Sequence, residues 1–436
     1  MGMTQADPTT DRLLVGNCLD TLKTLADDSI DSIVTDPPYE LGFMGKAWDA
    51  SGIAYQVDLW RECLRVLKPG GHLLAFGGTR TYHRMAVAIE DAGFEIRDSI
   101  HWTYGSGFPK SHNISKAIDK AAGAKREVVG ANKNVIRASK EAGGSDYGGF
   151  SKADASITAP ATKAAKKWNG WGTALKPSHE PIVVARKPIN QTVAENVLQY
   201  GTGGINIDAT RIGTTVETWP ASRSYAAGQK QPGHQGETQA TGDAPDGRFP
   251  ANTLLTHNHD CDTTCTTNCP IELLDQQSGL LTPGHWTKTT TTGFGEFGGG
   301  KSEYHGPGEK AEKGGASRFF HNSQWSVADD LTPFIYQAKP GKKERNAGLD
   351  DSNTHPTVKP VELIRYLIKM VTPPKGTVLD PFLGSGTTAV AAILEGVEWK
   401  GCELTEDYLP IIEGRTAWAT KEAKKKAKQP KQETLL

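Results

Sequence analysis

Apolar residues follow two regular patterns in the first quarter of the 436-residue chain. Short apolar runs predict strands at residues 13–15, 31–35, 72–76 and 94–102. Apolar positions spaced three and four apart predict helices at residues 20–25, 59–67 and 80–92. The glycines of Lys68-Pro69-Gly70-Gly71 are expected to end the second of these helices. This part of the chain therefore predicts alternating strands and helices.

The same alternation returns near the other end. Helices are predicted at 361–371 and 386–394, and strands at 377–379 and 399–404. Strands that alternate with helices build a parallel sheet covered on both faces. We therefore predict an α/β fold with a mostly parallel, doubly wound sheet, to which both ends of the chain contribute.

The middle of the chain, from about 113 to 330, has weak apolar periodicity. Gly, Ala, Thr, Ser and Lys dominate it, with predicted strands only at 180–185 and 249–256. The low-complexity stretch 287–300 is predicted to be a loop. The middle therefore predicts an insertion into a single α/β domain.

Composition narrows the class of protein without naming a partner. The chain has 49 Lys and Arg against 50 Asp and Glu, so any nucleic-acid contact must come from local basic clusters. Such clusters occur at 163–167, 186–187 and 342–343, and in a tail at 421–436 that we expect to be disordered. No segment has the pattern of a signal peptide or a membrane span, and six scattered cysteines do not indicate a disulfide scaffold. The expected compartment is cytoplasmic.

A glycine-rich turn follows the predicted strand at 377–379. Gly384 and Gly386 allow a close backbone approach to a ligand, and the next strand ends at Glu403, whose carboxylate can accept both hydroxyls of a ribose. Ala389 stands where a dinucleotide fingerprint needs its third glycine, which disfavours NAD at this turn. Thr387 follows Gly386 directly, where the phosphate-binding pattern needs Gly-Lys-Ser/Thr, which disfavours ATP there. The turn therefore predicts an adenosyl ligand.

Asp36-Pro37-Pro38-Tyr39 resembles the catalytic loop of amino-group DNA methyltransferases, and Asp380-Pro381-Phe382-Leu383-Gly384-Ser385-Gly386-Thr387-Thr388 resembles their S-adenosylmethionine (SAM) loop. The catalytic loop comes first, which resembles the permuted β class of phage and bacterial members. The resemblance covers 12–115, 172–212 and 331–418. It implies a Rossmann-like methyltransferase sheet with a catalytic half at 12–115, an inserted target-recognition region at 116–330 and a cofactor-binding half at 331–420.

The chemistry of the early loop suits methyl transfer to an amine. Asp36 offers a carboxylate and Pro37 a carbonyl, so two acceptors can hold the amino hydrogens and leave the nitrogen lone pair free. The two prolines, Pro37 and Pro38, make the loop rigid, and Tyr39 offers a face for an extruded base. No cysteine follows a proline, which excludes methylation of the cytosine ring carbon.

By the same resemblance, the cofactor contacts are expected from residues near the late loop: Asn17, Lys359, Asp380, Pro381, Phe382, Gly384, Gly386, Thr387 and Glu403. Asn17 stands where the family usually has aspartate, and its amide oxygen can still accept the adenine amino hydrogen.

The expected activity is methylation of adenine in double-stranded DNA, because Asp-Pro-Pro-Tyr is the usual adenine form of the motif. Cytosine N4 methylation is the alternative. A catalytically idle DNA-binding protein and an RNA substrate are weaker readings. The recognition sequence, dimerisation and a partner restriction nuclease stay open.

Four residues of the insertion have the ligand types that zinc prefers: His257, Cys261, Cys265 and Cys269. On a straight helix they would span about 18 Å, so the segment must wind as a loop if one ion is to bind them all. His259 is a fifth candidate, and reduced thiols without metal are the alternative. We predict a structural zinc site that supports the DNA-reading region.

Overall fold

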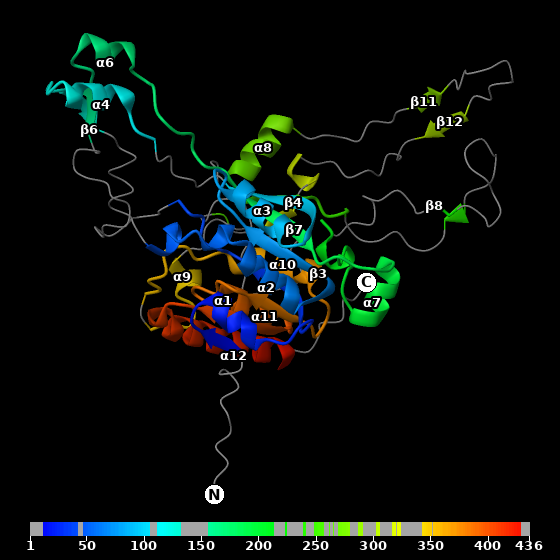
Figure 1. The fold of residues 1–436 in the computed structure, drawn as a ribbon. Helices are drawn as coiled ribbons and strands as arrows, with labels where there is room; N and C mark the ends of the chain where they lie inside the picture. The colour runs from blue at the N-terminus through cyan, green and yellow to red at the C-terminus, as the bar shows by residue number, and fades with distance from the viewer. Residues whose placement is uncertain are drawn as a thin grey trace, which may run out of the picture. The chain divides into compact units, whose positions relative to one another are not determined.

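The computed structural model describes residues 12–41, 47–104, 111–131, 156–212, 248–256, 269–279, 342–350 and 352–428. It also describes shorter pieces at 223–224, 239–240, 261, 265, 287–290, 302–305, 316–319 and 321–323. The chain divides into two compact units. Unit 1 is Met1–Ser106 with Ser178–Leu436, and unit 2 is Gly107–Pro177. Figure 1 shows the elements in chain order.

Unit 1 is built on one sheet that contains nine of the described strands. Their order is β1 (Leu13–Val15), β15 (Glu398–Glu403), β14 (Thr377–Asp380), β2 (Ile30–Thr35), β3 (Leu67–Phe76), β7 (His179–Arg186), β4 (Glu95–Thr103), β10 (Thr253–Thr256) and β13 (His321–Ser323). Only β7 runs antiparallel to its neighbours in this sheet. The predicted α/β class with a mostly parallel sheet is confirmed.

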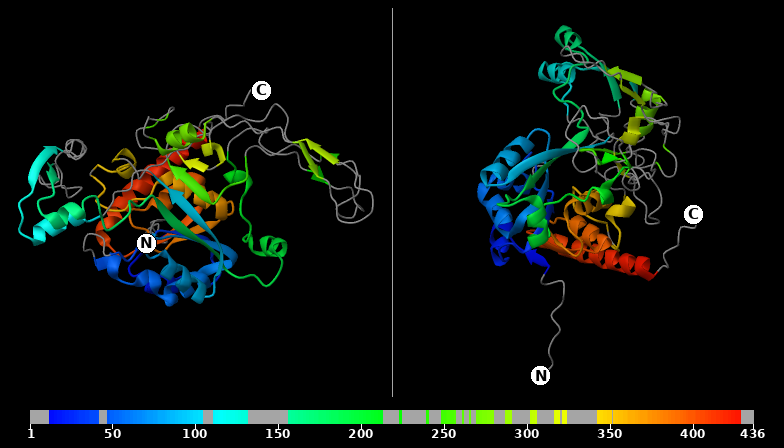
Figure 2. Two further views of the ribbon diagram at one scale, coloured as in Figure 1. Left: turned by 90° about the horizontal axis from the view of Figure 1, so that it is seen from above. Right: turned by 90° about the vertical axis from the view of Figure 1, so that its right-hand side faces the viewer.

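Helices cover both faces of the sheet (Figure 2, left). One face packs on α1 (Cys18–Thr21), α2 (Val57–Val66) and α3 (Tyr82–Asp91). The other packs on α10 (Val361–Val371), α11 (Thr387–Glu395) and α12 (Leu409–Lys428). Successive strand residues point to opposite faces, so Ile33 joins one apolar cluster and Val34 the other. All six residues of β2 are buried, because the strand lies between the two apolar clusters of unit 1.

The remaining described elements of unit 1 are shorter. Single turns occur at η1 (Leu22–Thr24), η3 (Ala47–Ala50), η4 (Ile53–Tyr55), η5 (Asp208–Thr210), η7 (Ala316–Phe319) and η8 (Glu406–Tyr408). Further helices are α7 (Val193–Tyr200), α8 (Pro270–Ser278) and α9 (Lys342–Arg345). Two hairpins pair β8 (Arg223–Ser224) with β9 (Gln239–Ala240) and β11 (Thr287–Thr290) with β12 (Ser302–His305). No described helix is long and apolar enough to cross a membrane.

The described part of unit 2 has two helices and two paired strands: α4 (Ile114–Ala121), β5 (Glu127–Ala131), β6 (Ser156–Ala159) and α6 (Lys163–Lys167). Its centre is Asp119, a buried carboxylate on α4. Asp119 accepts hydrogen bonds from the backbone N–H groups of Ala161 (2.9 Å) and Thr162 (3.0 Å) and pairs with Arg126 at 2.7 Å. One carboxylate thus joins the two helices to the hairpin.

Two predictions about the organisation of the chain are wrong, and the predicted domain boundaries stay a prediction. β7, β10 and β13, which fall within 116–330, belong to the main sheet, and unit 2 spans 107–177. Part of the predicted loop 287–300 is a strand, β11, because it pairs with β12. Residues 421–428 of the predicted disordered tail continue α12, since Lys, Ala and Glu all favour helix.

Candidate active site

The catalytic-loop candidate begins where β2 ends. Asp36 follows Thr35 directly, Pro37 is buried, and Tyr39 is half-buried. Because β2 is a central strand, the loop emerges at the carboxyl edge of the sheet between β14 and β3. Ligand sites of open α/β sheets lie at this edge. All four predicted catalytic residues, Asp36, Pro37, Pro38 and Tyr39, thus lie at this edge.

Asp36 belongs to a cluster of charged groups drawn from three distant parts of the chain. Lys359 Nζ lies 2.5 Å from Asp36 Oδ2 and 3.4 Å from Glu180 Oε2. The hydroxyls of Tyr39 and Tyr104 donate to the two oxygens of Glu180, at 2.7 and 3.1 Å. Neither Glu180 nor Tyr104 was predicted from the sequence.

Burial and charge act in opposite directions on this cluster. Burial raises the pKa of Asp36, and the attraction of Lys359 offsets only part of that rise. Burial alone would lower the pKa of Lys359, but the two carboxylates outweigh it and raise that pKa. Lys359 therefore stays charged and holds one oxygen of Asp36 in place.

The other carboxylate oxygen, Asp36 Oδ1, is available. It is buried and has no hydrogen-bond partner within the part of the chain that the structure describes. A buried acceptor without a partner is costly unless a ligand satisfies it. Oδ1 can therefore accept a hydrogen from a substrate amine while Lys359 fixes Oδ2.

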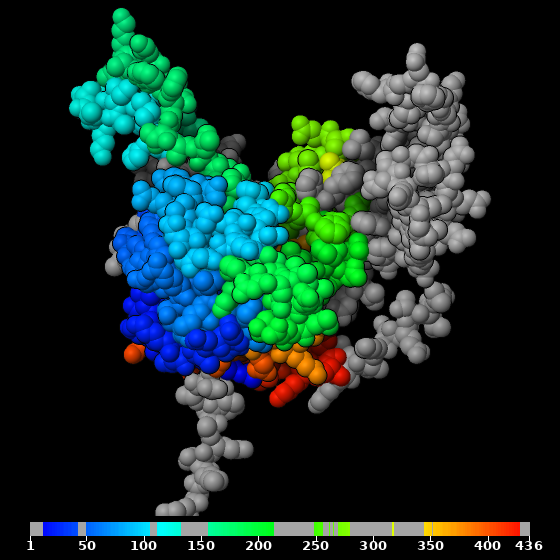
Figure 3. Space-filling view, turned by 45° about the vertical axis from the view of Figure 1, so that its right-hand side comes forward, coloured from blue at the N-terminus to red at the C-terminus, as the bar shows by residue number. Residues whose placement is uncertain are grey.

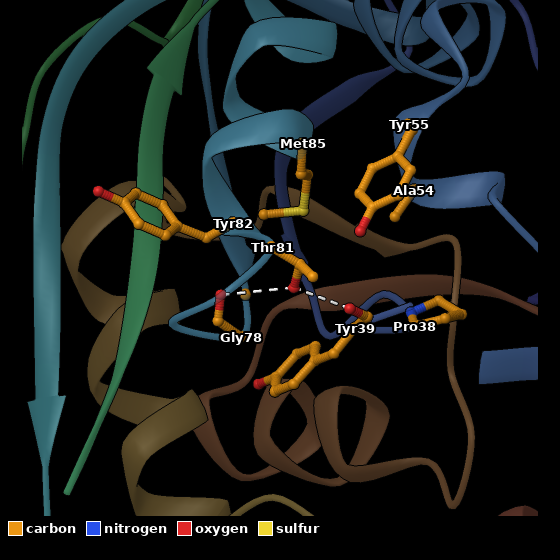
Figure 4. Close-up of a pocket in the computed structure, with 9 residues that line it drawn as sticks. Pro38, Tyr39, Ala54, Tyr55, Gly78, Thr81, Tyr82 and Met85 are labelled. Atoms are coloured by element: carbon orange, nitrogen blue, oxygen red, sulfur yellow. Dashed lines mark hydrogen bonds between the residues drawn. The ribbon is translucent and has the colours of Figure 1, made fainter. Parts of the chain in front are cut away.

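Hydrogen bonds to the backbone of Tyr39 and Glu40 fix the end of the catalytic-loop candidate. Thr81 Oγ1 donates to the Tyr39 carbonyl at 2.8 Å, beside a small pocket lined by Pro38, Tyr39, Ala54, Tyr55, Gly77, Gly78, Thr81, Tyr82 and Met85 (Figure 4). Glu40 has a left-handed backbone (φ 54°), and the buried carboxylate of Asp49 accepts its N–H at 3.0 Å. These contacts hold the loop in one conformation before any substrate binds.

The late glycine turn lies directly after β14, the neighbour of β2. Gly384 and Gly386 have φ of 54° and 77°, which other residues rarely adopt. A Cβ on Gly384 would come within 2.8 Å of His355 Nε2, so His355 lies directly over the turn. Burial lowers the pKa of His355 to about 3, and its ring packs edge-on against Tyr408. His355 is therefore a neutral, fixed wall beside the turn.

Asp380 connects the two loops. Its carboxylate accepts hydrogen bonds from the hydroxyls of Thr35 and Thr388, both at 2.7 Å, and from the Phe382 N–H at 3.0 Å. Thr35 is the residue before Asp36, and Thr388 lies in the first turn of α11. Burial raises the pKa of Asp380 to about 6. Asp380, predicted as a cofactor contact, here joins the ends of β2 and β14.

Two further predicted cofactor contacts also have partners within the protein. The Glu403 carboxylate accepts the N–H groups of Gly384 and Thr405, at 2.7 and 2.8 Å, so it lies at the turn as predicted. Asn17 caps α1 by accepting the Leu19 N–H at 3.0 Å. Their contacts with a cofactor stay predictions.

Arg415, which the sequence did not indicate as a site residue, holds the glycine turn through hydrogen bonds. Its buried guanidinium donates to the Ser385 carbonyl at 2.6 Å, to the Ser385 hydroxyl at 2.9 Å and to Thr387 Oγ1 at 3.1 Å. Burial lowers its pKa to about 10, so it remains charged at neutral pH. The predicted contact Thr387 is thus engaged, while Pro381 is buried and Phe382 half-buried within the same turn.

The predicted metal ligands are partly assembled. The sulfur atoms of Cys261, Cys265 and Cys269 all lie within 4.8 Å of one another. His257 lies outside the described residues. The remaining cysteines, Cys18, Cys63 and Cys402, are buried and are not part of this cluster.

Comparison with known sequences gives one match across most of the chain and several local ones. The profile of a family described as DNA methylase (N6_N4 methyltransferases) matches residues 30–414. The type II methyltransferase M.HpaI of Haemophilus parainfluenzae is 33% identical over 114 residues, 25% of this chain and 36% of that protein. M.ScaI of Streptomyces caespitosus, also a type II methyltransferase, is 45% identical over 65 residues, 15% and 21% of the two chains. Across five matched proteins, four type II methyltransferases and one methylase, the match spans 21% to 38% of each protein's own length.

Solved structures of similar architecture include methyltransferases. The PvuII DNA methyltransferase, described as cytosine-N4-specific, aligns over 95% of this chain and 91% of its own, with TM-score 0.41 and 13% identity. The M1.HpyAVI–SAM complex aligns over 93% and 98%, with TM-score 0.37 and 14% identity.

Proposed function

The chain belongs to the DNA methylase family, and from this premise we propose that it transfers a methyl group from SAM to the exocyclic amine of adenine in double-stranded DNA. The observation that carries the proposal is Asp36 Oδ1, a buried acceptor without a described partner, held beside the glycine turn by Thr35 and Asp380. The order of the two loops along the chain supports membership of the permuted β class.

The residues of the turn fit an adenosyl ligand. Gly384 and Gly386 adopt the left-handed φ values of 54° and 77° that form the tight turn, and the Glu403 carboxylate accepts the Gly384 N–H with lone pairs left for ribose hydroxyls. Gly384, Gly386 and Glu403 would hold the ligand, together with the predicted contacts Asn17 and Lys359. When bound, SAM supplies an electrophilic methyl group.

The chain's own residues then prepare the amine. Asp36 Oδ1 and the Pro37 carbonyl accept the two amino hydrogens, which leaves the nitrogen lone pair free to form the new bond. When the amine takes up a methyl group it must lose one proton, and the Asp36 carboxylate, which accepts one of its hydrogens, would take that proton. The target base is flipped out of the duplex to reach this site.

Adenine is proposed from the Asp-Pro-Pro-Tyr form of the loop. Cytosine N4 methylation uses the same acceptors and is the second candidate, favoured by the cytosine-N4-specific description of the PvuII enzyme alone.

Unit 2 is the proposed place of DNA contact. Residues 107–177 hold 13 Lys and Arg against 5 Asp and Glu, whereas the rest of the chain holds 36 against 45. Three exposed lysines, Lys163, Lys166 and Lys167, follow one another on α6, and Trp168 and Trp171 are exposed beside them. This concentration of positive charge on one small unit is typical of phosphate binding.

Methyl transfer from tritiated SAM to unmodified duplex DNA, with nucleoside analysis, tests the proposed activity. We expect label in N6-methyladenine, and none with Asp36→Ala. Asp58→Ala, which removes an exposed carboxylate on α2, is the matched control and should leave the label unchanged. Label in N4-methylcytosine would change the base, and absence of label with DNA binding retained would favour an idle DNA-binding protein.

The salt dependence of DNA binding tests the role of unit 2 separately. Changing Lys163, Lys166 and Lys167 to Gln should reduce the slope of log K against log salt by up to about 2.7, since each phosphate contact contributes about 0.9. The same change at Lys424, Lys425 and Lys426 removes equal charge from exposed positions of α12 and should leave the slope unchanged. Equal slopes for both triple variants would contradict the assignment.

A further inference from the structure

Three cysteines that the catalytic proposal does not use converge after β10. The sulfur atoms of Cys261, Cys265 and Cys269 lie within 4.8 Å of one another, and none of the three cysteines is in a disulfide. Cys261 and Cys265 lie outside any helix, whereas Cys269 is buried and is the N-cap residue of α8. Spacings of four residues along an extended or helical chain would not bring three thiols together, so the local fold selects this arrangement.

We propose that Cys261, Cys265 and Cys269 are three ligands of a structural zinc ion. In a tetrahedral thiolate site with Zn–S bonds of about 2.3 Å, the sulfur atoms lie about 3.8 Å apart. The observed separations allow that geometry with a small contraction around the ion. Soft thiolates favour zinc over magnesium or calcium, which prefer oxygen ligands. The fourth ligand is sought by substitution at His257 and His259, which lie outside the described residues.

The position of the cluster in the fold explains why a metal is useful there. Cys261 comes shortly after β10, and Cys269 leads into α8, which lies at the surface in Figure 3. On α8, Asp275 accepts hydrogen bonds from the N–H (2.7 Å) and hydroxyl (2.6 Å) of Ser317, in the turn η7 shortly before β13. The three thiols would therefore join the end of β10 to α8, the helix that contacts the turn before the edge strand β13.

This part of unit 1 has little apolar core of its own. Among its described residues from 248 to 323, the buried side chains are Leu254, Cys269, Ile271 and Ser317. A segment that buries few apolar groups gains little stability from packing, and a metal crosslink supplies stability that packing does not. Zinc is thus assigned a structural role in holding α8 against β10 and β13.

The cluster also lies on the functional edge of the sheet. β10 runs parallel to β4, which is antiparallel to β7. β3 is also antiparallel to β7 and runs parallel to β2, so β2, β4 and β10 all point the same way. The loops after β2 and β10 therefore emerge at the same edge. With four strand spacings between them, they lie about 19 Å apart. The ion would fix the chain at the same sheet edge as the loop after β2, too far from Asp36 to take part in its chemistry.

Metal analysis of the full-length protein, purified under reducing conditions from zinc-supplemented medium, tests the assignment. We expect about one zinc ion per chain, released by a thiol-modifying mercurial, and cobalt substitution giving the intense thiolate charge-transfer absorption of a multi-cysteine site. These two measurements use the unmodified chain and so do not depend on a variant folding. Absence of zinc, or cobalt spectra without thiolate bands, would overturn the proposal.

Single substitutions then locate the ion. Cys261→Ser, Cys265→Ser and Cys269→Ser should each lower the zinc content at least about tenfold, whereas Cys18→Ala, at a cysteine outside the cluster, should keep it. Loss of zinc with His257→Ala or His259→Ala would support the site and identify its fourth ligand. Zinc retained in all three serine variants, or a disulfide between two of these cysteines in the native protein, would refute the assignment.

Discussion

Replacing Lys359 with methionine removes the charge that holds the Asp36 carboxylate. Lys359 Nζ pairs with Asp36 at 2.5 Å and with Glu180 at 3.4 Å, and its side chain is 10% exposed. Methionine keeps most of the volume and the apolar contacts of the lysine stem. The variant therefore leaves two buried carboxylates close together without the cation between them.

Removing one partner of a buried ion pair typically costs about 3–5 kcal/mol. Because Asp36 is 20% exposed, solvent screening should reduce the loss in free energy of unfolding to about 2–3 kcal/mol. The matched control is Lys369→Met, which removes a 3.5 Å pair with Glu395 from a side chain that is 39% exposed. Its cost should stay below about 1 kcal/mol.

The loss should depend on pH with a definite sign. Burial already raises the pKa of Asp36, and without Lys359 that pKa rises further. The folded variant therefore carries the full cost of its ionised carboxylates at pH 8 and loses part of that cost as the pH falls and one of them binds a proton. Urea unfolding at pH 8 and pH 5 measures the difference. A loss equal at both pH values, or no larger than that of Lys369→Met, would refute the reasoning.

Three further predictions concern the glycine turn. Gly384→Ala should reduce SAM affinity at least about tenfold in calorimetry, because φ is 54° and the new Cβ meets His355, whereas Gly396→Ala is equally strained in φ but has open space and should bind normally. Arg415→Met should lower the free energy of unfolding in urea by about 2–4 kcal/mol and weaken SAM binding, since the Ser385 and Thr387 acceptors lose their buried donor. Burial raises the pKa of Asp380 to about 6 in the folded protein, so the free energy of unfolding should fall as the pH rises from about 4 through 6. Asp380→Asn has no carboxyl to ionise, so its free energy of unfolding in urea should fall less than that of the wild type across this window.

The sequence located both loops because each follows a strand with a strong apolar pattern. Residues 31–35 and 377–379 are apolar enough to predict buried strands, and a motif directly after such a strand must lie at its carboxyl edge. The residues that hold the loops gave no such signal. Glu180 and Arg415 are two of 99 charged residues, and nothing in their neighbours along the chain shows that they point inward.

The edge of the sheet was harder to predict for a different reason. β13 has three residues, too few to establish a period of two, and lies between long stretches rich in Gly and Thr. β10 falls within the strand predicted at 249–256, but nothing in the sequence placed it in the main sheet. The helix α4 and the hairpin of unit 2 are organised around Asp119, a polar centre that an apolar pattern cannot reveal. Predictions from apolar periodicity therefore succeed where a segment packs on an apolar core, and fail where a carboxylate such as Asp119 forms the centre instead.

The position of Asp380 explains how loops 344 positions apart can act as one site. β14 pairs with β2 through Val378 with Ser32 and Leu379 with Ile33, so the two strand ends are neighbours regardless of their order along the chain. The Asp380 carboxylate then bonds to Thr35 on one side and Thr388 on the other. These contacts across the sheet hold the two loops together. Displacement of the glycine turn would move Thr35 and, with it, Asp36, so if the turn holds SAM as proposed, cofactor binding and the position of Asp36 are coupled.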